Sequence, residues 1–110
     1  MKIIKKDLVI GRWKELDLVT QMANIGSEVE RTISWRDKGN KPYSQKAFYR
    51  SLELIDLTVE SLIIRSGLRE LTRLREVLVD YFAGQNDYSS SDSSWRKYFY
   101  VFNFAARKQS

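Results

Sequence analysis

Hydrophobic residues recur at helical spacing along most of the chain. Between positions 48 and 64 they step by three or four residues, which places them along one side of a helix. This stripe consists of Phe48, Leu52, Ile55, Val59 and Leu62, and it is widened by Leu54, Leu57, Ile63 and Ile64. A helix that is apolar over so much of its circumference must be covered on more than one side. We therefore expect the other helices to pack around this segment.

The same periodicity predicts four helices in total, over residues 12–36, 43–65, 68–83 and 93–107. Gly39 and Pro42 end the first helix and separate it from the second. Ser66-Gly67 is interpreted as a break between the second and third helices, with a kink in one long helix as the alternative. The serine-rich residues 85–94 form the clearest loop, and we expect it to be mobile.

Gly26 lies in the middle of the first predicted helix, where a glycine costs about 1 kcal/mol relative to alanine. A residue without a side chain allows a second helix to approach closely. We interpret Gly26 as the point where another helix crosses the first. Residues 1–11 are compatible with a short strand, a helical turn or an arm that packs on a second copy.

The chain of 110 residues suits a single domain, residues 1–110. Its short connections favour a compact, mostly antiparallel four-helix bundle of the all-α class, preceded by a short N-terminal arm. The longest apolar runs are too short for a membrane span or a secretory signal, so we expect a cytoplasmic protein with no membrane partner.

The absence of cysteine and histidine removes several function classes. Disulfides, the common zinc sites, the bundle-type di-iron motif and Ser-His-Asp or Cys-His catalysis all require one of these residues. No glycine-rich phosphate-binding motif is present either. We predict no cofactor, no metal, no catalytic residue and no enzymatic activity.

One carboxylate cluster is compatible with catalysis. Glu53, Asp56 and Glu60 share one side of the second predicted helix, where an inward orientation would allow hydrolysis or binding of a divalent ion. The simpler interpretation is the solvent-facing side of an amphipathic helix, and we prefer it.

The net charge is +5, and its excess lies at the two ends of the chain. Basic ends are typical either of solvated tails or of segments that attract nucleic acid or an acidic partner. The third helix adds a row of arginines, and the last helix begins with two more basic residues. The candidate contacts to phosphate or to an acidic partner are Arg65, Arg69, Arg73, Arg96 and Lys97. Salt bridging on the surface is the alternative for this row.

Six aromatic residues fall within residues 95–104 of the last helix. A single helix in a small bundle cannot bury aromatic side chains on all sides, so part of this surface is expected to meet another subunit or partner. The candidate interface residues are Trp95, Tyr98, Tyr100 and Phe104. Trp13 and Trp35 are interpreted as covering the ends of the core.

The segments Leu68–Leu78, Asp80–Phe82 and Trp95–Phe99 resemble a group of short bacterial all-helical proteins, and so do Trp35–Gly39 and Leu52–Thr58. This resemblance implies a helical fold and no particular activity. At the level of size and helix pattern only, the chain is similar to the four-helix bundles of the HEPN and nucleotidyltransferase-partner type. The Arg-to-His motif of the HEPN ribonucleases has no counterpart here, because the chain lacks histidine.

The sequence therefore favours a non-catalytic module that self-associates, as a dimer, or binds a protein partner. The alternative is a nucleic-acid-binding or nucleotidyltransferase-partner protein that uses the arginine-rich face.

Overall fold

The computed structural model describes residue 13, residues 15–62 and residues 65–109, and for residues 65, 66 and 109 it describes the backbone alone. The predicted arm, residues 1–11, lies outside these ranges. The described residues form four helices: α2 (Leu18–Asp37), α3 (Lys41–Ser61), α4 (Arg65–Ala83) and α5 (Asp92–Gln109). The all-α four-helix bundle is thus confirmed. No helix among these residues is long and apolar enough to cross a bilayer.

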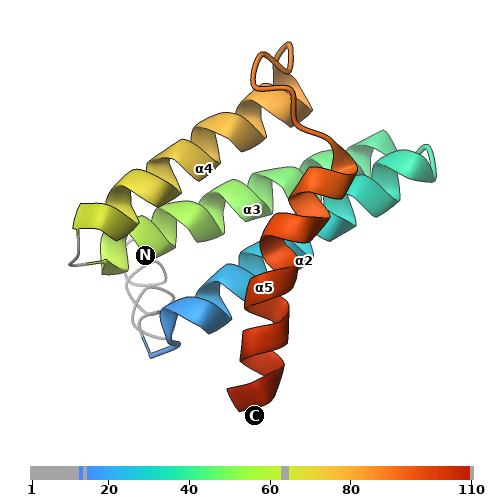
Figure 1. The fold of residues 1–110 in the computed structure, drawn as a ribbon. Coiled ribbons are helices and arrows are strands. Elements are labelled where there is room, and N and C mark those ends of the chain that lie inside the picture. The colour runs from blue at the N-terminus through green and yellow to red at the C-terminus, as the bar shows by residue number, and fades with distance from the viewer. Residues whose placement is uncertain (1–12, 14, 63–64, 110) are drawn as a thin grey trace, which may run out of the picture.

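The helices are arranged in space in the order α4, α3, α2, α5 (Figure 1). α3 packs against α2 and α4, and α2 packs against α3 and α5. The expectation that the second predicted helix is covered on more than one side is confirmed. It is not the single centre of the bundle, however, because α2 also lies between two helices and buries more residues than α3.

The first helix begins later than predicted. Residues 15–17 form a turn, and the helix starts at Leu18 rather than at residue 12. Asp17 is the N-cap, and its carboxylate accepts a hydrogen bond of 2.8 Å from the backbone N–H of Thr20. This bond satisfies one of the N–H groups that the first helical turn leaves without a partner. Because the apolar pattern continues upstream of Asp17, the pattern alone did not mark this start.

The connection between α2 and α3 is as short as the sequence suggested. Gly39 adopts a φ of +77°, the left-handed conformation that favours glycine after a helix. Asn40 then caps α3 by accepting a hydrogen bond from the N–H of Tyr43. Pro42 lies in the first turn of α3, where a missing N–H costs nothing, so α3 begins at Lys41 instead of residue 43.

A break separates α3 from α4, as expected, although it falls earlier than Ser66-Gly67. α3 ends at Ser61 and α4 begins at Arg65, so Gly67 lies inside the first turn of α4. The backbone of Leu62 is extended, with a ψ of 139°, and this conformation ends α3.

The core lies between all four helices. Its fully buried members include Ile25, Ile33, Ile55 and Leu78. Ser51 and Thr58, two polar residues of α3, are also fully buried. Their hydroxyls donate to carbonyl groups of their own helix, which satisfies them. The most buried line of α3 is thus displaced from the predicted apolar stripe, and Leu52 and Val59 are only partly buried.

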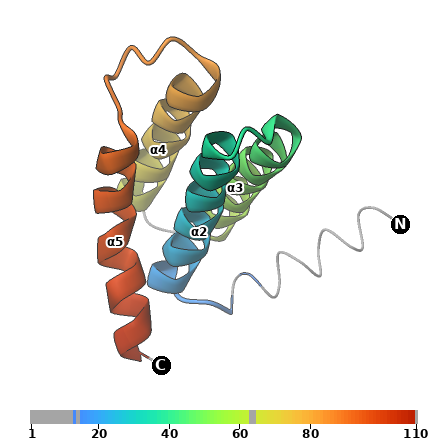
Figure 2. The same ribbon diagram turned by 90° about the vertical axis from the view of Figure 1, so that its right-hand side faces the viewer.

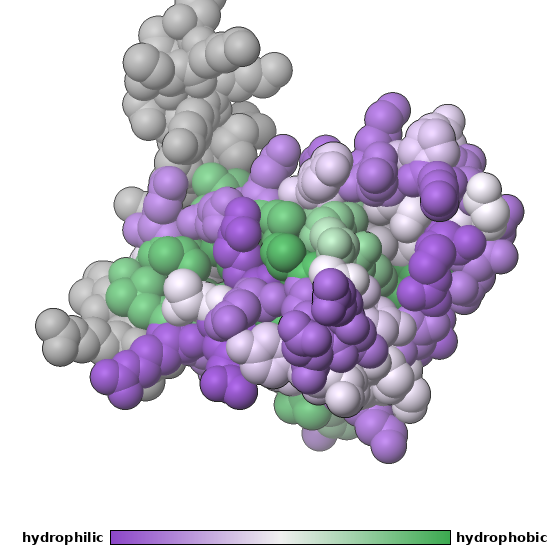
Figure 3. Space-filling model, turned by 90° about the horizontal axis from the view of Figure 1, so that it is seen from above, coloured by the Kyte–Doolittle hydropathy of each residue, from purple (hydrophilic) through white to green (hydrophobic). Residues whose placement is uncertain are grey.

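Trp13 closes one end of this core. Its indole Nε1 donates to Thr58 Oγ1 at 2.9 Å, and its carbonyl accepts from the buried side chain of Gln21 at 2.9 Å. The segment before α2 is thereby attached to both α2 and α3. The four helices still leave part of the apolar interior near the surface: seen from above, hydrophobic side chains lie between hydrophilic ones in the middle of the molecule (Figure 3).

The serine-rich loop after α4 is held by hydrogen bonds, in contrast to the expected mobile segment. The carboxylate of Asp80 accepts from the N–H groups of Asp87 and Tyr88, and the side chain of Asn86 bonds both the N–H and the carbonyl of Ser90. Ser91 then caps α5: its Oγ accepts from the N–H of Ser94, while Ser94 Oγ accepts from the N–H of Ser91. Side chains within residues 80–94 therefore fix the loop.

α5 crosses α2 obliquely, and its C-terminal half extends beyond the start of α2 (Figures 1 and 2). Its fully buried residues are Trp95 and Phe99, both in the N-terminal half. Residues 100–108 contain no fully buried side chain. The last helix therefore contributes to the core with one half and presents the other half outward.

Candidate functional site

A groove of about 510 Å³ runs between α2 and α5. Its base is formed near Gly26, where the two helices approach most closely. A Cβ built on Gly26 would lie 2.8 Å from Cβ, Cγ and Cδ1 of Phe99, so only glycine fits there without a shift of Phe99. This contact confirms the prediction that Gly26 marks a helix crossing.

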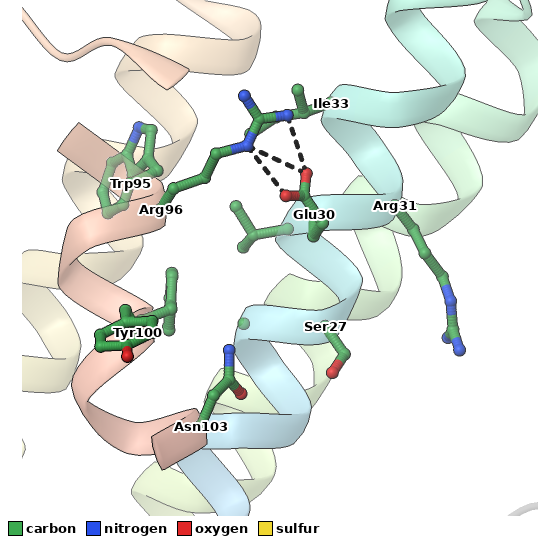
Figure 4. Close-up of a pocket in the computed structure, with 11 residues that line it drawn as sticks. Ser27, Glu30, Arg31, Ile33, Trp95, Arg96, Tyr100 and Asn103 are labelled. Atoms are coloured by element: carbon green, nitrogen blue, oxygen red, sulfur yellow. Dashed lines mark hydrogen bonds and ion pairs between the residues drawn. The ribbon is translucent and has the colours of Figure 1, made fainter. Parts of the chain in front are cut away.

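An ion pair spans the groove (Figure 4). The guanidinium of Arg96 on α5 binds the carboxylate of Glu30 on α2, with N–O distances of 2.9 and 3.1 Å. This hydrogen bond raises the pKa of Arg96. Tyr100 and Asn103 of α5 line the groove beyond the ion pair, and Ser27 of α2 also contributes to its lining (Figure 4). One end of the groove is thus charged, and the rest is bordered by an aromatic ring and small polar groups.

The structure divides the four candidate interface residues into two pairs. Trp95 and Tyr98 are turned toward the bundle: Trp95 is only 6% exposed, and Tyr98 is partly buried and donates to Glu70 of α4 at 2.9 Å. Burial, followed by this bond to a carboxylate, raises the pKa of Tyr98. Trp95 Nε1 is buried without a hydrogen-bond acceptor among the described residues. These two residues hold α5 onto the core and leave little surface for a partner.

Tyr100 and Phe104 are turned outward. Tyr100 is 64% exposed and Phe104 is 49% exposed, and their rings stack at 6.1 Å with an angle of 25°. Val101, next to them, is 64% exposed. We call Tyr100, Val101 and Phe104 the α5 outer face; Lys97 and Lys108 flank it along the helix. It is a contiguous apolar surface on the half of α5 that contributes nothing fully buried.

The five residues of the predicted arginine-rich face belong to two helices, α4 and α5. Arg69 is exposed on α4, whereas the guanidinium of Arg73 lies over the ring of Tyr88, 5.6 Å from its centroid. Arg96 is engaged by Glu30, as described above. Lys97 is exposed on α5, and the side chain of Arg65 lies outside the described residues. Of these five residues, Arg96 is the one for which the described part of the chain provides a carboxylate partner.

A second ionic cluster joins three helices near the start of α5. Asp92 accepts from Arg36 of α2 and from the hydroxyl of Tyr81 of α4, each at 2.5 Å. The bond from Arg36 is the main reason that the pKa of Asp92 is lowered. The pKa of Tyr81 is raised, first by burial and then by its bond to Asp92. This cluster fixes the position of the α5 N-terminus against α2 and α4.

The carboxylates that were considered for catalysis lie on the outside of the bundle. Glu53, Asp56 and Glu60 are all exposed, and Asp56 forms an ion pair of 2.9 Å with Arg75 of α4. They do not gather in a pocket, which was the condition for an enzymatic role. Within the described part of the chain, no group of three or more acidic side chains is arranged to hold a metal ion.

Sequence reasoning missed a second groove, which lies between α2 and α3. It is lined by aromatic and basic residues from positions 31–50, among them Trp35, Tyr43, Lys46 and Tyr49. The sequence does carry a signal, since residues 35–50 contain four aromatic and five basic residues against one acidic residue. The apolar periodicity of the two helices predicts only which of their sides is buried, and the groove lies on the other sides.

Comparisons of the chain with models of protein families, with curated proteins and with solved structures found no match. The resemblance to HEPN-type bundles accordingly stays a prediction.

Proposed function

We propose that this protein is a non-catalytic module that self-associates through the α5 outer face. The observation that carries the proposal is the exposure of Tyr100, Val101 and Phe104 on one side of a helix whose other side is in the core. Aromatic residues are enriched at subunit interfaces, where they bury a large area at small entropic cost.

A second copy of the chain is the occupant that fits this surface. Tyr100 belongs both to the α5 outer face and to the lining of the α2–α5 groove, so a projecting apolar surface and a groove lie side by side. A two-fold axis would place the outer face of each copy in the groove of the other. Such an isologous contact uses the same residues twice and closes at the dimer.

The experiment is the mass in solution, measured by light scattering over a range of protein concentrations and at two salt concentrations. We expect the mass to rise toward twice that of the monomer. Lys97 and Lys108 flank the outer face and would repel their counterparts across the two-fold axis. Salt screens that repulsion, so association should tighten or stay unchanged as salt is added. A monomer at every accessible concentration would refute the proposal.

The double variant Tyr100→Ser/Phe104→Ser tests the surface itself. Because both side chains are outside the core, the variant should remain helical by circular dichroism but stay monomeric. Tyr49→Ser is the matched control, since Tyr49 is a tyrosine of similar exposure, 56%, on α3. A control that dissociates as readily as the double variant would show that the interface lies elsewhere.

A further inference from the structure

The α2–α3 hairpin carries a groove of about 580 Å³ that combines aromatic rings with basic side chains. We propose that this groove binds single-stranded nucleic acid, with bases stacked on its tyrosines and phosphates bound by its lysine and arginine residues. The proposal does not rest on the function proposed above, because the groove lies on helices other than α5.

Three aromatic rings are presented at this groove. Tyr43 is 49% exposed and Tyr49 is 56% exposed, while Trp35 is partly buried. The ring of Trp35 meets that of Tyr43 edge to face, with centroids 4.9 Å apart, and Tyr49 rests against the core residue Phe48 at 5.8 Å. Each exposed tyrosine therefore contacts another ring while keeping about half of its own surface exposed.

The basic residues around these rings are not neutralised by the fold. No ion pair holds Lys38, Lys41, Lys46 or Arg50 among the described residues, whereas Arg31, Arg36, Arg75 and Arg96 each pair with a carboxylate. The ammonium of Lys38 lies over the ring of Trp35 at 5.0 Å, and that of Lys46 lies over Tyr43 at 5.6 Å. Cations without a carboxylate partner, beside exposed rings, match a ligand that has both phosphates and π faces.

Charged residues are unevenly distributed between the two ends of this groove. The hairpin end lies on the right in Figures 1 and 3, where the surface is strongly hydrophilic. Lys38 and Lys41 lie at this end, where the partial charges of the α3 N-terminus and of the neighbouring α2 C-terminus oppose each other. Glu53 lines the other end of the groove and would repel phosphate, while Glu28 is already bound by Arg31 at 2.5 Å. Phosphates should therefore bind away from Glu53, with bases stacked on Tyr43 and Tyr49.

An acidic peptide would use the cations but would leave the exposed tyrosine faces without a role. A duplex would offer phosphates but no exposed base to stack. A single strand uses both features, which is why we favour it over either alternative.

The test is fluorescence anisotropy with labelled oligouridine and oligothymidine of about ten nucleotides, a length within the usual site sizes for single strands. We expect binding at low salt that weakens linearly on a log–log plot against salt concentration. Tyr43→Leu and Tyr49→Leu should each weaken binding about 5- to 150-fold, the range for loss of one stacked base. A duplex of the same length should compete poorly.

A pair of charge-matched variants separates the groove from the general positive charge. Lys46→Gln/Arg50→Gln removes two groove cations, and Arg69→Gln/Lys97→Gln removes two exposed cations from α4 and α5. The first should weaken binding strongly and reduce the salt slope by about 1.4, and the second should change binding little. Equal effects of the two variants, effective competition by duplex, or no binding at low salt would each overturn the proposal.

The double variant Tyr100→Ser/Phe104→Ser should still bind the oligonucleotide, so that loss of self-association and loss of this site can be told apart.

Discussion

At Gly26 the backbone of α2 approaches the side chain of Phe99 as closely as a glycine allows. Gly26→Ala would raise helix propensity by about 1 kcal/mol, but the added methyl group would meet Phe99 at its Cβ, which cannot move without moving α5. Overpacking of this kind costs about 1–3 kcal/mol, so after the gain in helix propensity we expect a net loss of up to about 2 kcal/mol. Urea unfolding measures this change in the free energy of unfolding. The exposed neighbour serves as control, because Ser27→Ala should stay within about 0.5 kcal/mol of the parent. A stabilised Gly26→Ala variant would contradict the close crossing.

Asp92 gives a prediction about pH. Its folded-state pKa is lowered, mainly by the hydrogen bond from Arg36, whereas in the unfolded chain the pKa lies near its usual value of about 4. A lowered pKa contributes stability above the unfolded value, and this contribution disappears as pH falls through the folded value. The difference in unfolding free energy between the parent and Asp92→Asn should therefore be largest near neutral pH and shrink below about pH 4. Asp87→Asn, which removes an exposed carboxyl of the loop, is the control for the loss of one negative charge.

The capping of α5 shows how one serine in a run of similar residues acquires a specific role. Ser91 and Ser94 exchange hydrogen bonds across the first turn, while Ser93 points into solvent. Ser91→Ala removes the acceptor for the N–H of Ser94 and should cost about 1 kcal/mol in urea unfolding. Ser93→Ala is the matched control and should be neutral, because it removes no capping bond. Equal losses from both substitutions would show that the cap does not form.

The two ends of α5 should also differ in local stability. Its N-terminal half is fixed by the Arg36–Asp92–Tyr81 cluster and by the burial of Trp95 and Phe99. Its C-terminal half buries no side chain fully, so opening there exposes little additional apolar surface.

For the whole molecule this arrangement predicts a gradient of amide exchange. Amides of residues 22–33 in α2, which lies between two helices, should exchange most slowly, and those of residues 100–108 most rapidly in dilute protein. If the α5 outer face self-associates, exchange in residues 100–108 should slow at high protein concentration while α2 is unchanged. Hydrogen exchange read by mass spectrometry at two concentrations distinguishes this outcome. Slowing confined to α3 instead would place the interface on the hairpin.

The sequence by itself determined the fold class, the number of described helices, the existence of a break between the second and third predicted helices, and the crossing at Gly26. These features follow from local physics: apolar periodicity, a glycine in the left-handed region at position 39, and a helix-breaking proline at the start of α3. The predicted start of the first helix was wrong by several residues. The helix begins after the N-cap Asp17, but the apolar spacing continues on both sides of this residue and so does not mark the start.

Only the tertiary structure decided which aromatic and basic side chains are available. Trp95 and Tyr100 share one helix and one predicted role, yet Trp95 is buried and Tyr100 is 64% exposed, because their side chains lie on different sides of α5. Arg96 and Arg50 look alike in the sequence, but only Arg96 has a carboxylate across a helix interface. Burial and charge pairing depend on residues that are distant in the sequence, which is the physical reason that local patterns could not assign these surfaces.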